Sequence, residues 1–131
     1  MFAHLTLPTR HVEETTRFIE QALGYRRKRV PDNSPVEAQW LDIGHGQELH
    51  VFYVEGFELS PFESEFGRHV ALFHPVDDFP AVRRRIVEAG GELVEPLRAT
   101  HFQRLFFREP VNGYLFELID RERHREILAE A

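Results

Sequence analysis

The stretch RHVALF at residues 68–73 repeats the pattern of the stretch FAHLTL at residues 2–7. Each places one histidine, His69 or His4, at the start of an alternating apolar run, and the two histidines are 65 positions apart. Such alternation is typical of a strand with one face in the core. Internal repetition determines the architecture and has to be identified first. The two stretches therefore predict one structural unit that occurs twice.

The ends of the two copies correspond in the same way. His50 lies in ELHVFY near the end of the first copy, and Glu117 lies in YLFELI, 67 positions later. Between these points Trp40 corresponds to Phe106, at an offset of 66 positions. A nearly constant offset across several strands is difficult to obtain by chance, so we align the two copies in this register.

Both copies predict the order strand, helix and three further strands. In the first copy we expect these elements at residues 2–7, 12–23, 25–30, 36–43 and 47–54. In the second copy we expect them at residues 69–74, from about Pro80 to Gly90 or Gly91, and at 92–95, 103–108 and 114–120. Pro8 is expected to end the first strand, and Gly24 to end the first helix in a left-handed conformation.

The length of 131 residues fits one domain. We expect a single domain over residues 1–131, with module one at 1–54, a linker at 55–68, module two at 69–120 and a polar helical tail at 121–131. The element order predicts the α+β class, built from two βαβββ modules.

Composition excludes several classes of function. The formal net charge of −6 argues against a nucleic-acid-binding protein, which needs a basic surface. The chain has no cysteine, so disulfides and thiolate metal sites are impossible. No apolar run approaches the length of a membrane span, and the N-terminus carries no leader pattern. We therefore expect a cytoplasmic protein that binds neither nucleic acid nor membranes.

The polar residues that repeat lie in apolar surroundings. Glu117 shares a strand face with Leu115 and Ile119, because side chains alternate across a strand. A carboxylate in such a setting is unfavourable unless it is paired or bound to a cation. A solvated sheet face, or an ion pair with Arg104, would satisfy Glu117 without any ligand. A single buried histidine is likewise more often a hydrogen-bonded core residue than a ligand.

The repetition favours a metal site over these ordinary explanations. If the copies pair about a pseudo-two-fold axis, the equivalent strands bring together His4, His50, His69 and Glu117. Imidazole and carboxylate ligands together suit a borderline divalent metal such as Zn, Ni, Co, Mn or Fe(II). Four protein ligands on an octahedral ion would leave two positions for water or substrate.

A second group of charged residues lies outside this set. The loop at residues 97–104 carries Arg98, His101 and Arg104. These side chains offer charged hydrogen bonds to an anionic substrate group. Solvation at the protein surface is the ordinary explanation, and we favour it over a binding role.

The chain resembles the vicinal oxygen chelate superfamily, which includes glyoxalases, bleomycin resistance proteins and extradiol dioxygenases. The resemblance covers residues 2–120 and rests on four features. They are HLTLP at 4–8, the helix end from Phe18 to LGY at 23–25, His69, and FREPVNGYLFEL at 107–118.

This resemblance implies a glyoxalase-like fold, in which two βαβββ modules form a curved, cavity-enclosing mixed β-sheet with a metal in the cavity. His4, His69 and Glu117 fall on the three ligand positions that its metalloenzymes share. His50 falls on a fourth position that is usually glutamate in glyoxalase I, so Glu117 is left as the catalytic group for proton transfer. The resemblance also implies a homodimer, with His4 and His50 from one chain and His69 and Glu117 from its partner.

Three functions agree with these expectations. The first is a metal-dependent glyoxalase-type lyase or isomerase that chelates a small oxygenated substrate. The second is a non-haem Fe(II) extradiol-type ring-cleaving dioxygenase, which needs open coordination positions for dioxygen. The third is a non-catalytic small-molecule binding protein of the bleomycin resistance type. Occupation of all four ligand-type positions argues against the third.

Overall fold

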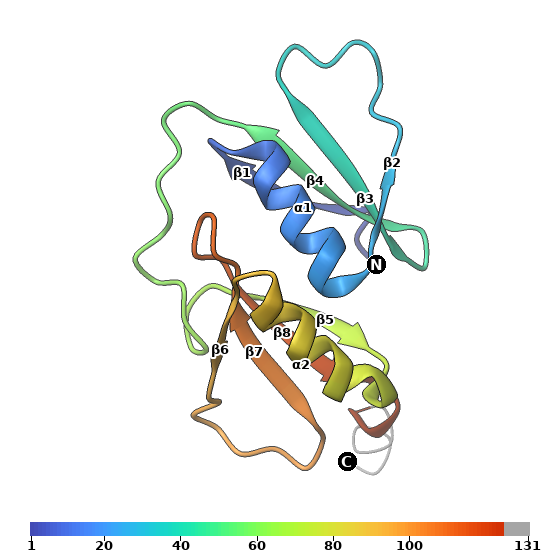
Figure 1. Cartoon of the computed structure of the whole chain (residues 1–131), viewed down its shortest axis with the longest axis vertical. Coiled ribbons are helices and arrows are strands. Elements are labelled where there is room, and N and C mark those ends of the chain that lie inside the picture. The colour runs from blue at the N-terminus through green and yellow to red at the C-terminus, as the bar shows by residue number, and fades with distance from the viewer. Residues whose placement is uncertain (125–131) are drawn as a thin grey trace. The chain divides into compact units, whose positions relative to one another are not determined.

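The computed structural model describes residues 1–124, and its chain divides into two compact units, Met1–Glu58 and Leu59–Ala131 (Figure 1). Residues 121–124 of the predicted helical tail are helical, and the rest of the tail lies outside the described residues. Among the described residues, no helix is both long enough and apolar enough to cross a membrane.

The first unit contains one helix and one mixed sheet of four strands. Its elements are β1 (His4–Thr9), α1 (Val12–Leu23), β2 (Arg26–Lys28), β3 (Ala38–Gly44) and β4 (Gln47–Tyr53). The strands are ordered β1-β4-β3-β2. Only β1 and β4 pair in parallel, and the other neighbours are antiparallel.

The second unit repeats this topology. Its elements are β5 (Val70–His74), a short 3₁₀ helix η1 (Val76–Asp78), α2 (Phe79–Glu88), β6 (Glu92–Val94), β7 (Arg104–Arg108) and β8 (Leu115–Asp120). The strands are ordered β5-β8-β7-β6, again with the first pair parallel and the others antiparallel. The predicted α+β fold with two βαβββ modules is therefore confirmed.

The expected end of the first strand is wrong. Pro8 does not end the first strand, because β1 continues through Pro8 to Thr9. The reason is that β1 is an edge strand with β4 as its one neighbour, and a proline without an N–H is tolerated on an edge. Gly24, in contrast, ends α1 as expected, with φ of 75° and its N–H donated to the Glu20 carbonyl.

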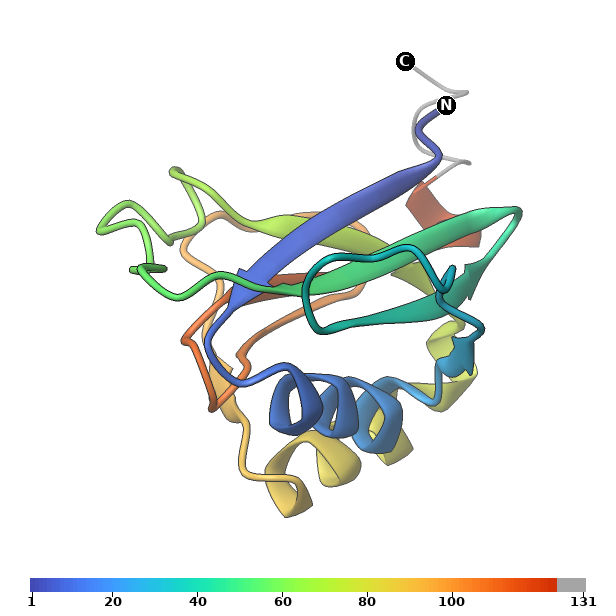
Figure 2. The same ribbon diagram turned by 90° about the horizontal axis from the view of Figure 1, so that it is seen from above.

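In each unit the helix covers one face of its own sheet (Figure 2). The core of the first unit lies between α1 and the inward face of the strands, and includes Leu7, Phe18, Ile19, Leu41, Leu49 and Val51. The core of the second unit includes Val82, Ile86, Leu105, Phe107, Phe116 and Leu118. Because side chains alternate along a strand, the predicted site residues on β4 and β8 occupy the face away from the helix.

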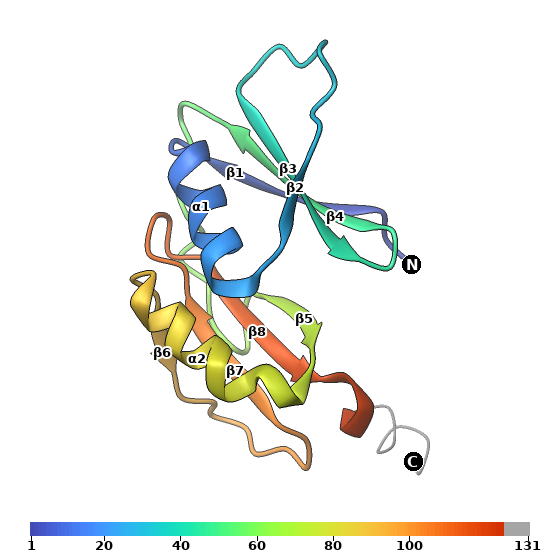
Figure 3. The same cartoon turned by 45° about the vertical axis from the view of Figure 1, so that its right-hand side comes forward.

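A buried carboxylate closes the turn that joins β7 to β8, two strands that lie side by side in Figure 3. The Glu109 side chain is fully buried and accepts backbone hydrogen bonds from Val111, Asn112 and Tyr114 at 2.8, 2.9 and 3.2 Å. Gly113 takes a φ of 93° within this turn, a conformation that favours glycine. The turn therefore sets where β8 begins, and with it the place of Glu117.

Candidate functional site

The sheet register brings the repeated polar residues to equivalent points of the two units. His50 pairs with Trp40 on β3, and Glu117 pairs with Phe106 on β7. On the other side, His50 pairs with Thr6 of β1, as Glu117 pairs with Ala71 of β5. Each polar residue thus lies on a central strand beside an aromatic residue.

In the first unit, His50 lies between two rings. Its imidazole stacks on His4 with ring centroids 3.9 Å apart and an interplanar angle of 12°. It also stacks on Trp40, again at 3.9 Å, with an angle of 5°. Nitrogen lone pairs lie in the plane of an imidazole ring, so two nearly parallel stacked rings confine them to separate, nearly parallel planes. In this conformation His4 and His50 do not aim at one common point.

The edge of the His50 ring contacts a carboxylate. His50 Nε2 lies 2.9 Å from Glu48 Oε1, and Lys28 donates a hydrogen bond to Glu48 Oε2. Hydrogen bonds with Lys28, which has the larger effect, and with His50 hold the pKa of Glu48 below its usual range. His4, in contrast, is exposed, and its imidazole makes no hydrogen bond within the described residues. Glu48 was not among the predicted site residues, although its position two residues before His50 places it on the same strand face.

In the second unit, His69 and Glu117 face each other. His69 directly precedes β5, and its Nε2 lies 3.1 Å from Glu117 Oε1. The other ring nitrogen, Nδ1, lies 3.2 Å from the Ser64 carbonyl oxygen. A carbonyl only accepts hydrogen bonds, so Nδ1 carries a proton in this contact. The Glu117 side chain is 6% exposed and that of His69 is 20% exposed, so the pair is accessible from the His69 side.

Arg104 binds the second oxygen of Glu117. The guanidinium on β7 donates from Nη1 to Glu117 Oε2 at 3.2 Å and lies over the Phe106 ring at 5.2 Å. Its Nη2 donates to Glu65 Oε2 at 3.1 Å. The ion pair between Glu117 and Arg104 that the sequence left open is therefore present. Glu65 was missed, because its contact with Arg104 joins residues 39 positions apart and no local pattern indicates it.

Each unit thus brings together two of the four predicted site residues. His4 and His50 are in contact in the first unit, and His69 and Glu117 are in contact in the second. Within either unit, over residues 1–124, no three histidine or acidic side chains form a group that could hold a metal ion. Each unit by itself provides a pair of candidate ligands.

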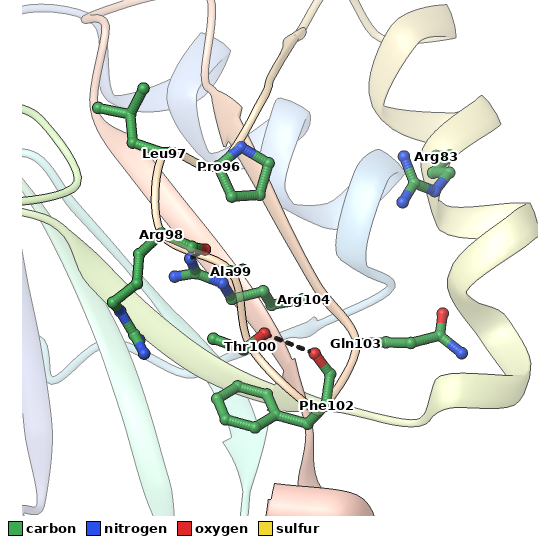
Figure 4. Close-up of a pocket in the computed structure, with 9 residues that line it drawn as sticks. All are labelled: Arg83, Pro96, Leu97, Arg98, Ala99, Thr100, Phe102, Gln103 and Arg104. Carbon is green, nitrogen blue, oxygen red and sulfur yellow. Dashed lines mark hydrogen bonds between the residues drawn. The ribbon is translucent and has the colours of Figure 1, made fainter.

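The loop between β6 and β7 lines a cavity of about 410 Å³ in the second unit (Figure 4). Its lining residues are Arg83 from α2, the loop segment 96–100, Phe102, Gln103 and Arg104. Glu65 fixes the loop, because its carboxylate accepts the backbone N–H groups of Leu97 and Arg98 at 2.6 and 3.0 Å. These contacts hold the pKa of Glu65 below its usual range although burial opposes them.

The chain is similar to several known proteins. It is 25% identical over 121 residues to "Glyoxylase I 4" of Arabidopsis thaliana, which covers 88% of this chain and 67% of that protein. The fosfomycin resistance protein FosX from Mesorhizobium loti aligns over 98% of this chain and 97% of its own, at 18% identity and a TM-score of 0.73.

A mutant FosX from Listeria monocytogenes, complexed with Mn(II) and 1S,2S-dihydroxypropylphosphonic acid, aligns at 16% identity with a TM-score of 0.76. That alignment covers 96% of this chain and 97% of FosX. At these identities the likeness to the solved structures establishes the fold. The family model of the Glyoxalase/Bleomycin resistance protein/Dioxygenase superfamily matches residues 1–118, and the chain belongs to this superfamily.

Proposed function

We propose that this protein is a cytoplasmic metal-dependent enzyme of the glyoxalase type, a lyase or isomerase acting on a small oxygenated substrate. In this proposal His4, His69 and Glu117 hold a divalent metal ion, and Glu117 also moves the proton. The observation that carries the proposal is the arrangement of His69 against Glu117 in the second unit.

Two acceptor atoms face each other in that pair. With the Nδ1 proton directed at Ser64, a neutral His69 presents the Nε2 lone pair to a carboxylate oxygen 3.1 Å away. Such a contact requires a second proton on the ring or a cation bound by both atoms. Neighbouring ligands about 2.1 Å from a metal and at right angles lie about 3 Å apart, which matches the observed separation. The pair therefore fits two adjacent positions on one ion.

The surrounding contacts fit the same role. Metal-binding histidines commonly donate their other N–H to a carbonyl, which orients the ring, and Ser64 provides that carbonyl for His69. Arg104 holds Glu117 Oε2, which fixes the carboxylate and leaves Oε1 directed at His69. The ion pair with Arg104 therefore agrees with a ligand role for Glu117.

The first unit would provide His4, whose ring nitrogens have no hydrogen-bond partner within the described residues. His50 is the fourth candidate ligand. To bind the metal together with His4 it must leave the stack, and its Nε2 is already engaged with Glu48. A three-ligand site needs no such rearrangement. We therefore rank His50 below His4, His69 and Glu117 as a metal ligand.

A bound divalent ion would act as a Lewis acid on the substrate oxygens that it chelates. The chain itself supplies the proton acceptor, for which Glu117 Oε1 is placed on the accessible side of the pair. Arg104 keeps that carboxylate oriented through its other oxygen. Because a related FosX was crystallised with Mn(II), we would test Mn(II) first, followed by Zn, Ni, Co and Fe(II).

The same three-ligand set is compatible with one alternative function. If His50 stays with Glu48, the ligand set is two histidines and one glutamate, which leaves three open positions on an octahedral ion. That set suits an Fe(II) extradiol-type dioxygenase, whose substrate and dioxygen both need coordination positions.

Metal identification followed by a substrate screen with and without oxygen tests the proposal. We expect the purified protein to contain a divalent metal and to turn over a hemithioacetal without oxygen. Oxygen uptake with catechols would instead support the dioxygenase. Binding of small molecules without metal and without turnover would contradict both enzymes and indicate a resistance-type binding protein.

We further propose a homodimer in which His4 and His50 of one chain meet His69 and Glu117 of its partner. Mixing His4→Ala and Glu117→Ala proteins tests this arrangement. In a mixed dimer one site carries both substitutions and the other carries none, so complete exchange restores metal binding at about a quarter of all sites. Absence of any restoration despite demonstrated exchange would contradict the cross-chain site.

A further inference from the structure

Both backbone polar groups of Arg98 are bound by residues of the ion-pair network that includes Glu117. Its N–H donates to Glu65 Oε2 at 3.0 Å, and its carbonyl accepts a hydrogen bond from Arg104 Nη2. The same Arg104 donates to Glu117 through Nη1. One guanidinium therefore joins the Arg98 backbone to the carboxylate of the proposed metal site.

The side chain of Arg98, unlike its backbone, is uncommitted. It is exposed, and within the described residues its guanidinium has no hydrogen bond or ion pair. The charge of Arg104, in contrast, is balanced by Glu65 and Glu117. In a chain with 22 acidic and 16 basic residues, a cation without a partner beside this network is available to an external anion.

The cavity offers an internal comparison for Arg98. Arg83 lines the same cavity from helix α2 and is also exposed without a partner in the described part of the chain. Figure 4 shows the two arginines on opposite sides, with the Arg98 side chain extending away from Arg83. Of the two arginines, only Arg98 has its backbone bound to Glu65 and to Arg104, the residue that donates to Glu117.

We propose that Arg98 binds the anionic group of the substrate, so that the substrate is a small carboxylate or phosphonate. This inference rests on the proposed function, because that function places the reacting oxygens of the substrate at Glu117. Glu65 and Arg104 act as positioning residues, because they fix the Arg98 backbone relative to that carboxylate. A guanidinium suits both carboxylate and phosphonate through paired N–H donors. The held backbone lowers the entropy lost when the anion binds.

Nuclear magnetic resonance titrations of the full chain test the proposal with butyrate, propylphosphonate and, as the neutral control, butyramide. We expect both anions to shift the Arg98 amide and side-chain signals, and butyramide to leave them unchanged. Arg98→Gln should weaken anion binding about tenfold or more, since hydrogen bonds to charged groups are strong. The matched variant Arg83→Gln should stay within about twofold of the unsubstituted protein, since we assign it no anion contact. The stronger of the two anions identifies the substrate class.

Equal weakening of anion binding by both variants would indicate general charge attraction and would overturn the proposal. Anion binding that survives Arg98→Gln would also overturn it. So would the absence of anion binding in the unsubstituted protein. Metal content is measured in parallel, before and after chelation. If Arg98-dependent anion binding persists in a protein without metal affinity, the anion site stands and the proposed enzyme fails. If metal binds but anions do not, the proposed metal site stands and the anion site fails.

Discussion

The two units place an imidazole and a carboxylate at equivalent points and then stabilise them by opposite means. In the first unit His50 receives an acid, Glu48, from its own strand. In the second unit Glu117 receives a cation, Arg104, from the neighbouring strand β7. The aromatic neighbour, Trp40 or Phe106, is common to both.

The added partner in each unit has no counterpart in the other. Two residues before Trp40 stands Ala38, where the second unit has Arg104 before Phe106. Two residues before Glu117 stands Leu115, where the first unit has Glu48 before His50. The comparison teaches that the repeat preserves the positions while the partners differ, with an acid beside the imidazole of His50 and a guanidinium beside the carboxylate of Glu117.

Removal of the carboxylate in the second unit should have the largest effect. Glu117→Gln leaves the buried Arg104 with Glu65 as its one remaining acidic partner, and we expect the free energy of unfolding to fall by roughly 3 kcal/mol. Urea unfolding measures the loss. Arg104→Met should cost less stability in this variant than in the unsubstituted protein, because the pair with Glu117 is already broken. Equal costs in both proteins would show that the ion pair is not the cause.

The strand-to-helix corners extend the comparison to acid stability. In the second unit Asp78 binds Arg85 and His74, and these contacts, chiefly that with Arg85, lower the pKa of Asp78 from 3.8 to about 2. In the first unit the corresponding corner is held by neutral hydroxyls, with Thr9 Oγ1 accepting from the His11 N–H and lying 3.3 Å from Thr15 Oγ1.

A carboxyl whose pKa is lowered by folding stabilises the protein above its unfolded pKa and loses that contribution as the pH falls. Asp78→Asn should therefore be less stable than the unsubstituted protein at pH 5, and the difference should shrink as the pH falls from about 4 towards 2. Urea unfolding across this range measures it. Thr15→Val should show a difference that does not depend on pH, and a constant difference for Asp78→Asn would refute the role of the ion pair.

A smaller effect is expected for the carboxylate of the first unit. Glu48→Gln keeps the shape but removes the charge beside His50 and Lys28, and should cost about 1 kcal/mol, because Glu48 is partly exposed. Metal content should be unchanged, since Glu48 belongs to no proposed ligand set. Loss of metal in this variant would place Glu48 in the site.

The smallest effect is expected for Trp40→Phe, which gives the first unit the aromatic residue of the second. The buried Trp40 Nε1 has no hydrogen-bond partner in the described residues, so its removal forfeits no bond and the unfolding free energy should change by less than about 1 kcal/mol. A larger loss in urea unfolding would show that the indole fills space that phenylalanine leaves empty.

Sequence reasoning found the features that depend on local periodicity. The repeat offset aligned Trp40 with Phe106, and alternation placed Glu117 on one strand face with Leu115 and Ile119. Pro8 was misjudged because edge position is a property of the sheet. Glu65 was missed because its partners, Leu97, Arg98 and Arg104, come close only through the chain's tertiary path.

The central claim is that the metal is held by His4, His69 and Glu117. Its most direct test is the metal stoichiometry of natively purified protein, measured for the unsubstituted chain and for His4→Ala, His50→Ala, His69→Ala and Glu117→Ala. We predict that His4→Ala, His69→Ala and Glu117→Ala lose the metal, whereas His50→Ala retains it. Unchanged stoichiometry in both His69→Ala and Glu117→Ala would contradict the claim.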